Sequence, residues 1–110
     1  MLAKKNRLLP SVKISKANSI NTPYFSLRVS PNKFDKENKF GFIVTKVIDK
    51  RAVVRNKIKR RFRSCIEDNL NNIKGESNYL FFIKKEALEL NKKDLCKQII
   101  LVLKKESIIY

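Results

Sequence analysis

Alternating apolar and polar residues predict two strands in the first half of the chain. Along Tyr24–Ser30 every second residue is apolar, starting at Phe25, so one face of this strand is expected to be buried and the other to meet solvent. Phe40–Val47 is rich in aromatic and β-branched residues and contains Gly41. The sequence PNKFDKENK between them supplies turn-forming and charged residues. We therefore expect the two strands to pair as an antiparallel hairpin with a long loop.

In the second half, the spacing of apolar residues first changes to that of a helix. From about Lys50 to Ile73 the apolar residues follow the helical period, and no Gly or Pro interrupts them. Asn78–Lys84 is apolar on both faces, which predicts a strand in the centre of the sheet. Asn91 is placed to cap a final helix. The buried stripe of that helix is predicted to consist of Leu95, Ile99, Val102 and Leu103.

This order of elements predicts an α+β fold, a two-layer sandwich in which helices cover one face of a small mixed sheet. A helix that connects neighbouring strands makes one of the strand pairs parallel. Residues 1–110 are expected to form a single domain, with a short N-terminal helix or arm over residues 1–20. The side chains of Phe25, Phe81 and Phe82 are assigned to the core.

The net charge of the chain indicates a negatively charged binding partner. It carries 26 Lys and Arg against 10 Asp and Glu, a formal net charge of +16. This excess is larger than solubility requires and destabilises the compact state through self-repulsion, so a polyanionic partner is expected. Hydrophobic residues nevertheless make up 43% of the chain, unlike the composition of a disordered basic tail. The charge therefore belongs to a folded basic domain.

Several kinds of site are excluded by residue types that the chain lacks. It contains no histidine, which is the commonest general base, metal ligand and partner of a nucleophilic Ser or Cys. Cys65 and Cys96 are interpreted as small buried thiols in the reduced state, without the spacing of a zinc site. The longest apolar run, Ile99–Leu103, is too short to span a bilayer, and no signal-peptide core is present. We therefore expect a cytoplasmic protein in which a hydrolase site built from protein side chains alone is difficult to form and a metal site is poorly supported.

The segment Lys50–Arg63, KRAVVRNKIKRRFR, combines dense positive charge with an apolar stripe. On a helix of about 100° per residue, the stripe occupies an arc of roughly 80° and consists of Val54, Ile58, Phe62 and Cys65. A separate row of polar and basic residues lies beside it, formed by Arg55, Lys59 and Arg63 and then by Asn56 and Arg60. Lys57 and Arg61 fall on the opposite flank. Like charges at this spacing repel each other, whereas a phosphate backbone would make the same row favourable through counterion release.

Other interpretations of this basic segment fit less well. A solvated helix face usually interleaves both signs of charge, but the nearest acids are Asp49 before the segment and Glu67 after it. A membrane-surface helix needs bulky apolar residues that can enter lipid, whereas this stripe is needed to cover the sheet. A DNA-binding regulator of this size usually shows helix-turn-helix spacing or a zinc set, and neither is present. Charge alone therefore favours nucleic acid without deciding which kind.

The stretch Phe40–Arg63, FGFIVTKVIDKRAVVRNKIKRRFR, resembles the strand and basic helix of the bacterial ribonuclease P protein component. In that family a glycine-led strand ending in Ser-Lys or Thr-Lys leads into the pattern A-V-x-R-N-x-x-K-R-x-x-R. The matching residues are Ala52, Val53, Arg55, Asn56, Lys59, Arg60 and Arg63, and Lys57 stands where the family usually has Arg. Weaker similarity, beginning at Lys4–Leu8, extends over nearly the whole chain. Val47 and Asp49 depart from the pattern, because the family has Lys and Gly there.

The resemblance implies a fold with a left-handed β-α-β crossover, although right-handed crossovers are the general rule. It also implies that the chain is the RNA-binding protein subunit of a ribonucleoprotein endonuclease. In such an enzyme a catalytic RNA removes the 5′ leader of precursor tRNA, with Mg²⁺ held mainly by the RNA. The protein is then expected to have no catalytic side chain, no metal site of its own and no organic cofactor. The expected partners are the catalytic RNA and precursor tRNA, and neither DNA nor a membrane. The implied RNA-binding residues are Lys46, Arg51, Arg55, Asn56, Lys57, Lys59, Arg60 and Arg63.

The resemblance also places the leader in a cleft between the sheet and the N-terminal helix. Tyr24, Arg28 and Phe42 are the residues expected to line it, and Arg28 stands where the family often has Tyr. The N-terminal segment lacks the aromatic residues that the family usually contributes. For Tyr24 and Phe42, packing in the core or against the sheet is the simpler interpretation. The alternative function is a non-enzymatic RNA-binding module of the same fold, such as a ribosomal or RNA-chaperone protein.

Overall fold

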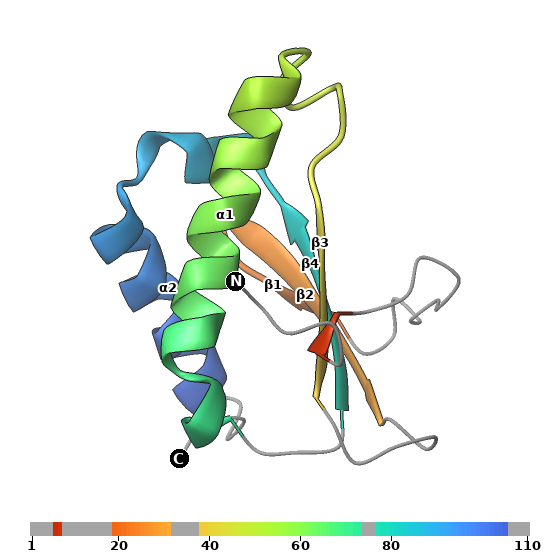
Figure 1. Cartoon of the computed structure of the whole chain (residues 1–110), viewed down its shortest axis with the longest axis vertical. Coiled ribbons are helices and arrows are strands. Elements are labelled where there is room, and N and C mark those ends of the chain that lie inside the picture. Colours follow the sequence, from red (N-terminus) through yellow and green to blue (C-terminus); the bar gives the residue numbers. More distant parts are fainter. Residues whose placement is uncertain (1–5, 8–18, 32–37, 74–76, 106–110) are drawn as a thin grey trace.

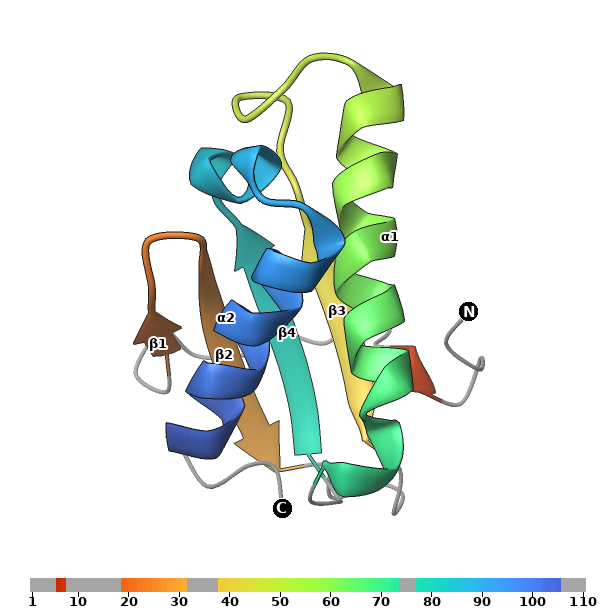
Figure 2. The ribbon, with the colours of Figure 1, turned by 90° about the vertical axis from the view of Figure 1, so that its left-hand side faces the viewer.

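The computed structural model describes residues 6–7, 19–31, 38–73 and 77–105. Its strands are β1 (Ser19–Asn21), β2 (Phe25–Pro31), β3 (Lys39–Ile43) and β4 (Ser77–Ile83). Its helices are α1 (Ala52–Asp68) and α2 (Lys92–Lys105), with short 3₁₀ helices η3 (Leu70–Asn72) and η4 (Lys85–Glu89). The strands form one sheet in the order β1-β2-β4-β3, and α1 and α2 cover the same face of it (Figures 1 and 2). The predicted α+β sandwich is confirmed.

The predicted hairpin between Tyr24–Ser30 and Phe40–Val47 is wrong. β4 lies between β2 and β3, and it pairs antiparallel with β2 and parallel with β3. β4 buries residues on both of its faces, among them Leu80 and Phe81, so the centre of the sheet suits it best. The central position of this strand and the single parallel pair were predicted correctly. The order of strands along the chain did not show that a later strand would separate two earlier ones.

The helix α1 connects the two parallel strands β3 and β4. In Figure 2 β4 points upward behind the helices, β3 runs parallel to it, and β4 lies to the left of β3. The crossover is therefore left-handed, as the resemblance implied and contrary to the general rule. As a result, α1 lies over the side of the sheet whose outermost strand is β3.

The first half of the chain differs from the prediction at two places. The chain leaves the sheet after Ile43, and Val47, predicted as part of a strand, is 93% exposed in the turn that follows. Apolar character alone does not show where a strand loses its partner. The short strand β1 was not predicted and includes two residues assigned to the N-terminal arm. Of the rest of that arm the structure describes Asn6 and Arg7, and Arg7 forms a parallel bridge with Phe40 beside β3.

The helix α1 ends before the predicted Ile73. Asn69 follows the last helical residue, and its side-chain Nδ2 donates to the carbonyl oxygen of Cys65 at 2.8 Å. Its backbone N–H donates to the carbonyl oxygen of Ile66 at 3.1 Å, as in a tighter turn. Asn side chains compete in this way with the regular hydrogen bonds of a helix, which explains the end at this residue.

The core lies between the sheet and the helices and is centred on Phe62. This side chain is fully buried, and its ring centre lies 5.8 Å from that of Phe25, 6.1 Å from that of Phe42 and 5.8 Å from that of Phe81. The buried residues of α1 are Ile58, Phe62, Cys65 and Ile66, and those of α2 are Leu95, Ile99 and Leu103. Both predicted stripes are therefore confirmed in their central residues, with Val54 and Val102 half-buried at the margins.

Two further details concern individual side chains. Asn91 caps α2 as predicted, because its Oδ1 accepts a hydrogen bond from the backbone N–H of Asp94 at 2.8 Å.

Phe82 was wrongly assigned to the core. It is half-buried on the face of the sheet away from the helices, where the guanidinium carbon of Arg28 lies 4.2 Å from its ring centre.

The prediction that the two cysteines are free thiols is also wrong. Cys65 of α1 and Cys96 of α2 form a disulfide. They are 31 residues apart in sequence, but the packing of both helices on one face of the sheet brings their Cα atoms to 5.5 Å. This separation is ordinary for a disulfide. Sequence spacing could not reveal a contact that depends on the packing of two helices.

Removing this disulfide should lower the free energy of unfolding by about 2–4 kcal/mol, because the cross-link restricts the unfolded chain. The double variant Cys65→Ala with Cys96→Ala should therefore unfold at a lower urea concentration than the oxidised wild type, as followed by circular dichroism. A reductant should shift the wild-type curve in the same direction and leave the double variant unchanged. A wild-type curve that does not respond to reductant would contradict the disulfide.

Candidate nucleic-acid interface

The outward side of α1 carries a row of basic and amide side chains. The buried stripe holds the helix against the sheet, so Asn56, Arg60 and Arg63 are exposed and Lys59 is half-buried. We call these four residues the α1 ridge. The guanidinium carbon of Arg63 lies 5.8 Å from the ring centre of Phe42 in β3, so the ridge follows the outer strand of the sheet. Within the described ranges, no carboxylate forms an ion pair with a cation of the ridge.

Arg55 belongs to the predicted row, but it has a local role in the structure. Its Nη1 donates to the carbonyl oxygens of Asp49 and Lys50, at 3.0 Å each. These hydrogen bonds tie the segment before α1 to the first turn of the helix, and Arg55 is half-buried. Lys46, another predicted RNA contact, is exposed in the preceding turn. A substitution of Arg55 would therefore change this segment as well as the charge.

Asp49 stands where the family pattern has Gly, and it organises the start of α1. Its carboxylate accepts hydrogen bonds from Arg51, namely from the backbone N–H at 2.8 Å, Nε at 3.1 Å and Nη2 at 2.9 Å. The side-chain and backbone hydrogen bonds from Arg51, together with its positive charge, lower the pKa of Asp49 from 3.8 to about 2. The Arg51 side chain remains 75% exposed, so its outer edge can still meet a ligand.

The titration of Asp49 provides a test of this arrangement. Because its folded-state pKa lies below 3.8, the ionised carboxylate stabilises the fold above that pH, and the contribution is lost as the pH falls toward about 2. An NMR titration of the Asp49 carboxyl carbon should give a midpoint near pH 2. In Arg51→Gln the midpoint should rise toward 3.8, whereas Lys50→Gln, at an exposed neighbour, should leave it in place. A wild-type midpoint near 3.8 would refute the assignment.

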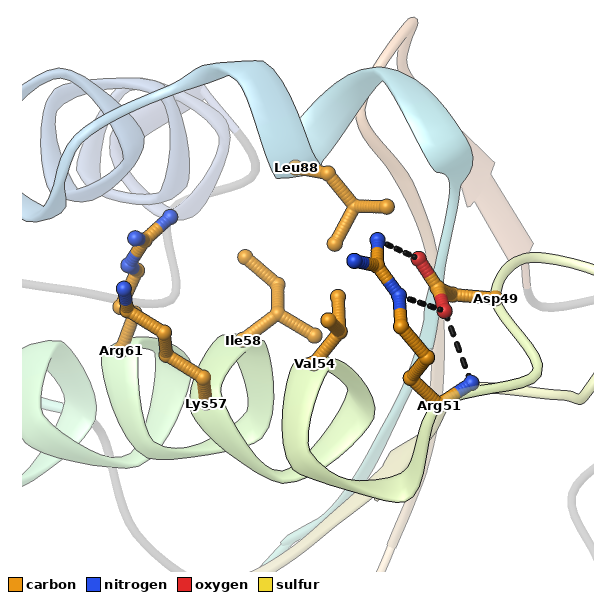
Figure 3. Close-up of a pocket in the computed structure, with 7 residues that line it drawn as sticks. All are labelled: Asp49, Arg51, Val54, Lys57, Ile58, Arg61 and Leu88. Carbon is orange, nitrogen blue, oxygen red and sulfur yellow. Dashed lines mark hydrogen bonds and ion pairs between the residues drawn. The ribbon is translucent and has the colours of Figure 1, made fainter.

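The opposite flank of α1 forms a pocket (Figure 3). Its volume is about 250 Å³, and it is lined by Asp49, Arg51, Val54, Lys57, Ile58, Arg61 and Leu88. Helix geometry had placed Lys57 and Arg61 on this flank. The Nη1 atom of Arg61 donates to the carbonyl oxygen of Leu90 at 2.8 Å, which connects α1 to the segment after η4. Sequence reasoning had not assigned a binding role to Arg61, and no local signal marks Leu88, because only the tertiary fold brings η4 to α1.

The three residues expected to line the leader cleft do not come together. Phe42 is 9% exposed on the face covered by the helices, with its ring centre 5.4 Å from that of Phe81. Arg28 lies on the other face of the sheet, over Phe82. Tyr24 is half-buried and packs against the core just before β2. Phe42 and Arg28 therefore cannot line one cleft, and Phe82 is the aromatic residue that accompanies Arg28.

The structure also bears on metal binding and membrane insertion. No group of three or more His, Cys, Asp or Glu that could hold a metal ion occurs among residues 6–7, 19–31, 38–73 and 77–105. In the same part of the chain, no helix has both the length and the apolar character needed to cross a membrane.

Comparisons with known sequences give the relatives of the chain. A family model described as Ribonuclease P matches residues 2–107. The ribonuclease P protein component of Microcystis aeruginosa is 32% identical over 73 residues, and that of Pseudoalteromonas translucida is 35% identical over 78 residues. These matches cover 66% and 71% of this chain. They cover 61% and 54% of the relatives, so the chain spans less than two thirds of their length.

Solved structures show the same fold. The RNase P protein from Staphylococcus aureus matches with a TM-score of 0.76 at 24% identity, over 99% of this chain and 96% of that one. The RNase P protein from Thermotoga maritima matches with a TM-score of 0.71 at 20% identity, over 79% of this chain and 81% of that one. At these identities the similarity establishes the arrangement of strands and helices.

Proposed function

Because the chain belongs to the ribonuclease P family, we propose that it is the protein subunit of a ribonucleoprotein endonuclease that removes the 5′ leader from precursor tRNA. The observation that carries this proposal is the α1 ridge. Its cations stand on a helix whose other side is fixed in the core, and no described carboxylate neutralises them. The repulsion within such a row becomes favourable when RNA phosphates bind and condensed counterions are released.

Each side chain of the ridge has a defined part in binding RNA. The guanidinium groups of Arg60 and Arg63 can bond two phosphate oxygens at once, and Lys59 supplies a point charge. Asn56 has both a donor and an acceptor and suits a ribose hydroxyl or a base edge. Since all four project from one helix packed on the sheet, their spacing is set before the RNA arrives, which reduces the entropic cost of binding. The further contacts are Lys46, Arg51 and Lys57, while Arg55 mainly holds the segment before the helix.

The leader of the precursor is proposed to lie on the face of the sheet away from the helices. Arg28 and Phe82 form the centre of this contact, since the guanidinium carbon lies 4.2 Å from the ring centre. A cation over an aromatic ring offers one group for a phosphate and one for a base, which is the combination that single-stranded nucleic acids require. Tyr24 at the start of β2 has a supporting role, and Phe42 has none because it packs in the core.

The cleavage chemistry is assigned to the RNA partner. Hydrolysis of a phosphodiester needs an activated water and stabilisation of developing negative charge, and Mg²⁺ held by RNA supplies both. The described residues contain no group of three or more His, Cys, Asp or Glu that could hold a metal ion, so no step is assigned to a protein-bound metal. The protein contributes binding, orientation and positive charge.

Reconstitution with the catalytic RNA of the same organism tests the proposal. At a low Mg²⁺ concentration, where few ions screen the RNA, adding the protein should restore cleavage of precursor tRNA at the end of its leader. A protein that binds RNA without restoring cleavage would be an RNA-binding module of the same fold. A preference for duplex DNA over structured RNA in a competition at fixed salt would indicate a DNA-binding regulator. Either result would refute the proposed function.

A further inference from the structure

The pocket on the opposite flank of α1 has two chemically different ends and apolar walls between them (Figure 3). At one end Arg51 and Asp49 neutralise each other through two side-chain hydrogen bonds. At the other end Lys57 and Arg61 lie one helical turn apart. Val54, Ile58 and Leu88 line the space between these ends, with Leu88 contributed by η4.

The two cations at the second end have no described acidic partner. Lys57 is exposed, and the bonded atom of Arg61 donates to a neutral acceptor, the carbonyl oxygen of Leu90, at 2.8 Å. This hydrogen bond directs the Arg61 guanidinium without cancelling its charge. Two like charges at this spacing on a helix repel each other, so an anion placed between them stabilises the pair. This end of the pocket therefore has the chemistry of a phosphate contact.

The volume and the apolar lining of the pocket limit which chemical group can be attached to that anion. Its volume of about 250 Å³ lies below the range of roughly 300–1,000 Å³ that is usual for sites of drug-sized ligands. Three aliphatic side chains, Val54, Ile58 and Leu88, form a small apolar surface in this space, which suits one flat ring. A nucleotide combines a base with a flat face and a phosphate, and an RNA chain supplies both.

We infer that this pocket takes one unstacked nucleotide of an RNA chain, with its base against Val54, Ile58 and Leu88 and its phosphate on Lys57 and Arg61. The inference rests on the proposed function, since it requires RNA along α1. RNA commonly presents single bases that have left the stack in loops and bulges, and proteins bind them on apolar or planar side chains. The ridge would then hold the backbone on one flank of α1 while the pocket holds a base on the other.

NMR of the full chain, labelled uniformly with ¹⁵N and with ¹³C in its methyl groups, tests the inference, with a short single-stranded oligoadenylate as the probe. A base seated in the pocket should shift the Leu88 methyl protons upfield through its ring current. Lys57→Gln should weaken the affinity measured at Leu88 by roughly fivefold, because one phosphate contact is lost. In Leu88→Ala, oligoadenylate binding measured at the Val54 and Ile58 methyl groups should weaken by a similar factor, while the backbone amide signals of Arg60 and Arg63 still respond. Lys85→Gln, an exposed residue of η4 outside the pocket, is the matched control and should change neither value.

The outcomes separate this inference from the proposed function. If the ridge signals shift and those of Leu88 do not, the pocket assignment is overturned and the proposed function stands. If neither set responds to oligoadenylate or to the catalytic RNA, both fail. Inorganic phosphate that reproduces the Leu88 shifts would reveal a simple anion site and overturn the inference. Adenosine monophosphate that saturates the pocket while oligoadenylate does not would reveal a site for free nucleotides, with the same consequence.

Discussion

Replacing Lys59, Arg60 and Arg63 together by Gln should weaken binding of the catalytic RNA about a hundredfold at moderate salt, because three phosphate contacts are lost. The same change should make the slope of log K against log salt shallower by about 2–3, since each neutralised phosphate releases slightly less than one counterion. Filter binding at several salt concentrations measures both quantities. The three side chains lie outside the buried stripe, so the circular dichroism spectrum should stay unchanged.

A charge-matched variant distinguishes the ridge from the overall charge of the protein. Lys85, Lys92 and Lys105 are exposed and lie outside α1, so replacing them by Gln removes the same net charge. The ion pair of Lys92 with Asp68 is itself largely exposed and contributes little to stability. This control should lose only a few-fold in affinity, through the long-range field. Equal losses in the two triple variants would mean that net charge, and not the ridge, determines RNA binding.

Arg55 is left out of the ridge variant for a structural reason. Its Nη1 holds the carbonyl oxygens of Asp49 and Lys50, so truncation would release the segment before α1 as well as remove a charge. A loss of RNA affinity in Arg55→Ala would therefore have two causes. Lys59, Arg60 and Arg63 make no such hydrogen bond within the described residues, and the interpretation of their removal is correspondingly simpler.

Phe62→Ala should lower the free energy of unfolding by about 3–5 kcal/mol. The ring is fully buried and contacts three other aromatic rings, so its removal leaves a cavity that the surrounding β-sheet cannot fill. A loss of this size is a large part of the roughly 5–15 kcal/mol that stabilises an ordinary domain. Urea denaturation followed by circular dichroism gives the value.

Two further variants make the Phe62 result decisive. Val53 lies in the same helix but is 79% exposed, so Val53→Ala should change the free energy of unfolding by less than about 0.5 kcal/mol. If Phe62→Ala proves too unstable to measure, Phe62→Leu keeps part of the apolar volume and should give a smaller, measurable loss. A change in Phe62→Ala no larger than that in Val53→Ala would show that the core is centred elsewhere.

The separation of charged and apolar residues on α1 could be predicted from the sequence, because a helix places residues at a fixed angle. Ile58 and Phe62 are buried, while Arg60 and Arg63 are exposed, as the angles required. The position of Lys57 on the opposite flank followed from the same geometry. The ring of Phe42 lies in the core, which the sequence had favoured over a place in the leader cleft. The alternation along a strand could not show, however, which of its two faces the helices would cover.

The sequence by itself determined the kinds of element, their buried faces and the basic character of α1, because these depend on the spacing of residues within one segment. The tertiary structure alone decided which segments meet. It placed β4 between β2 and β3, joined Cys65 to Cys96, and brought Leu88 to the flank of α1 beside Lys57 and Arg61. The spacing of apolar residues in one segment predicts that a face of a helix or strand will be buried. It does not predict which element will cover that face, because the contact depends on the packing of all the elements together.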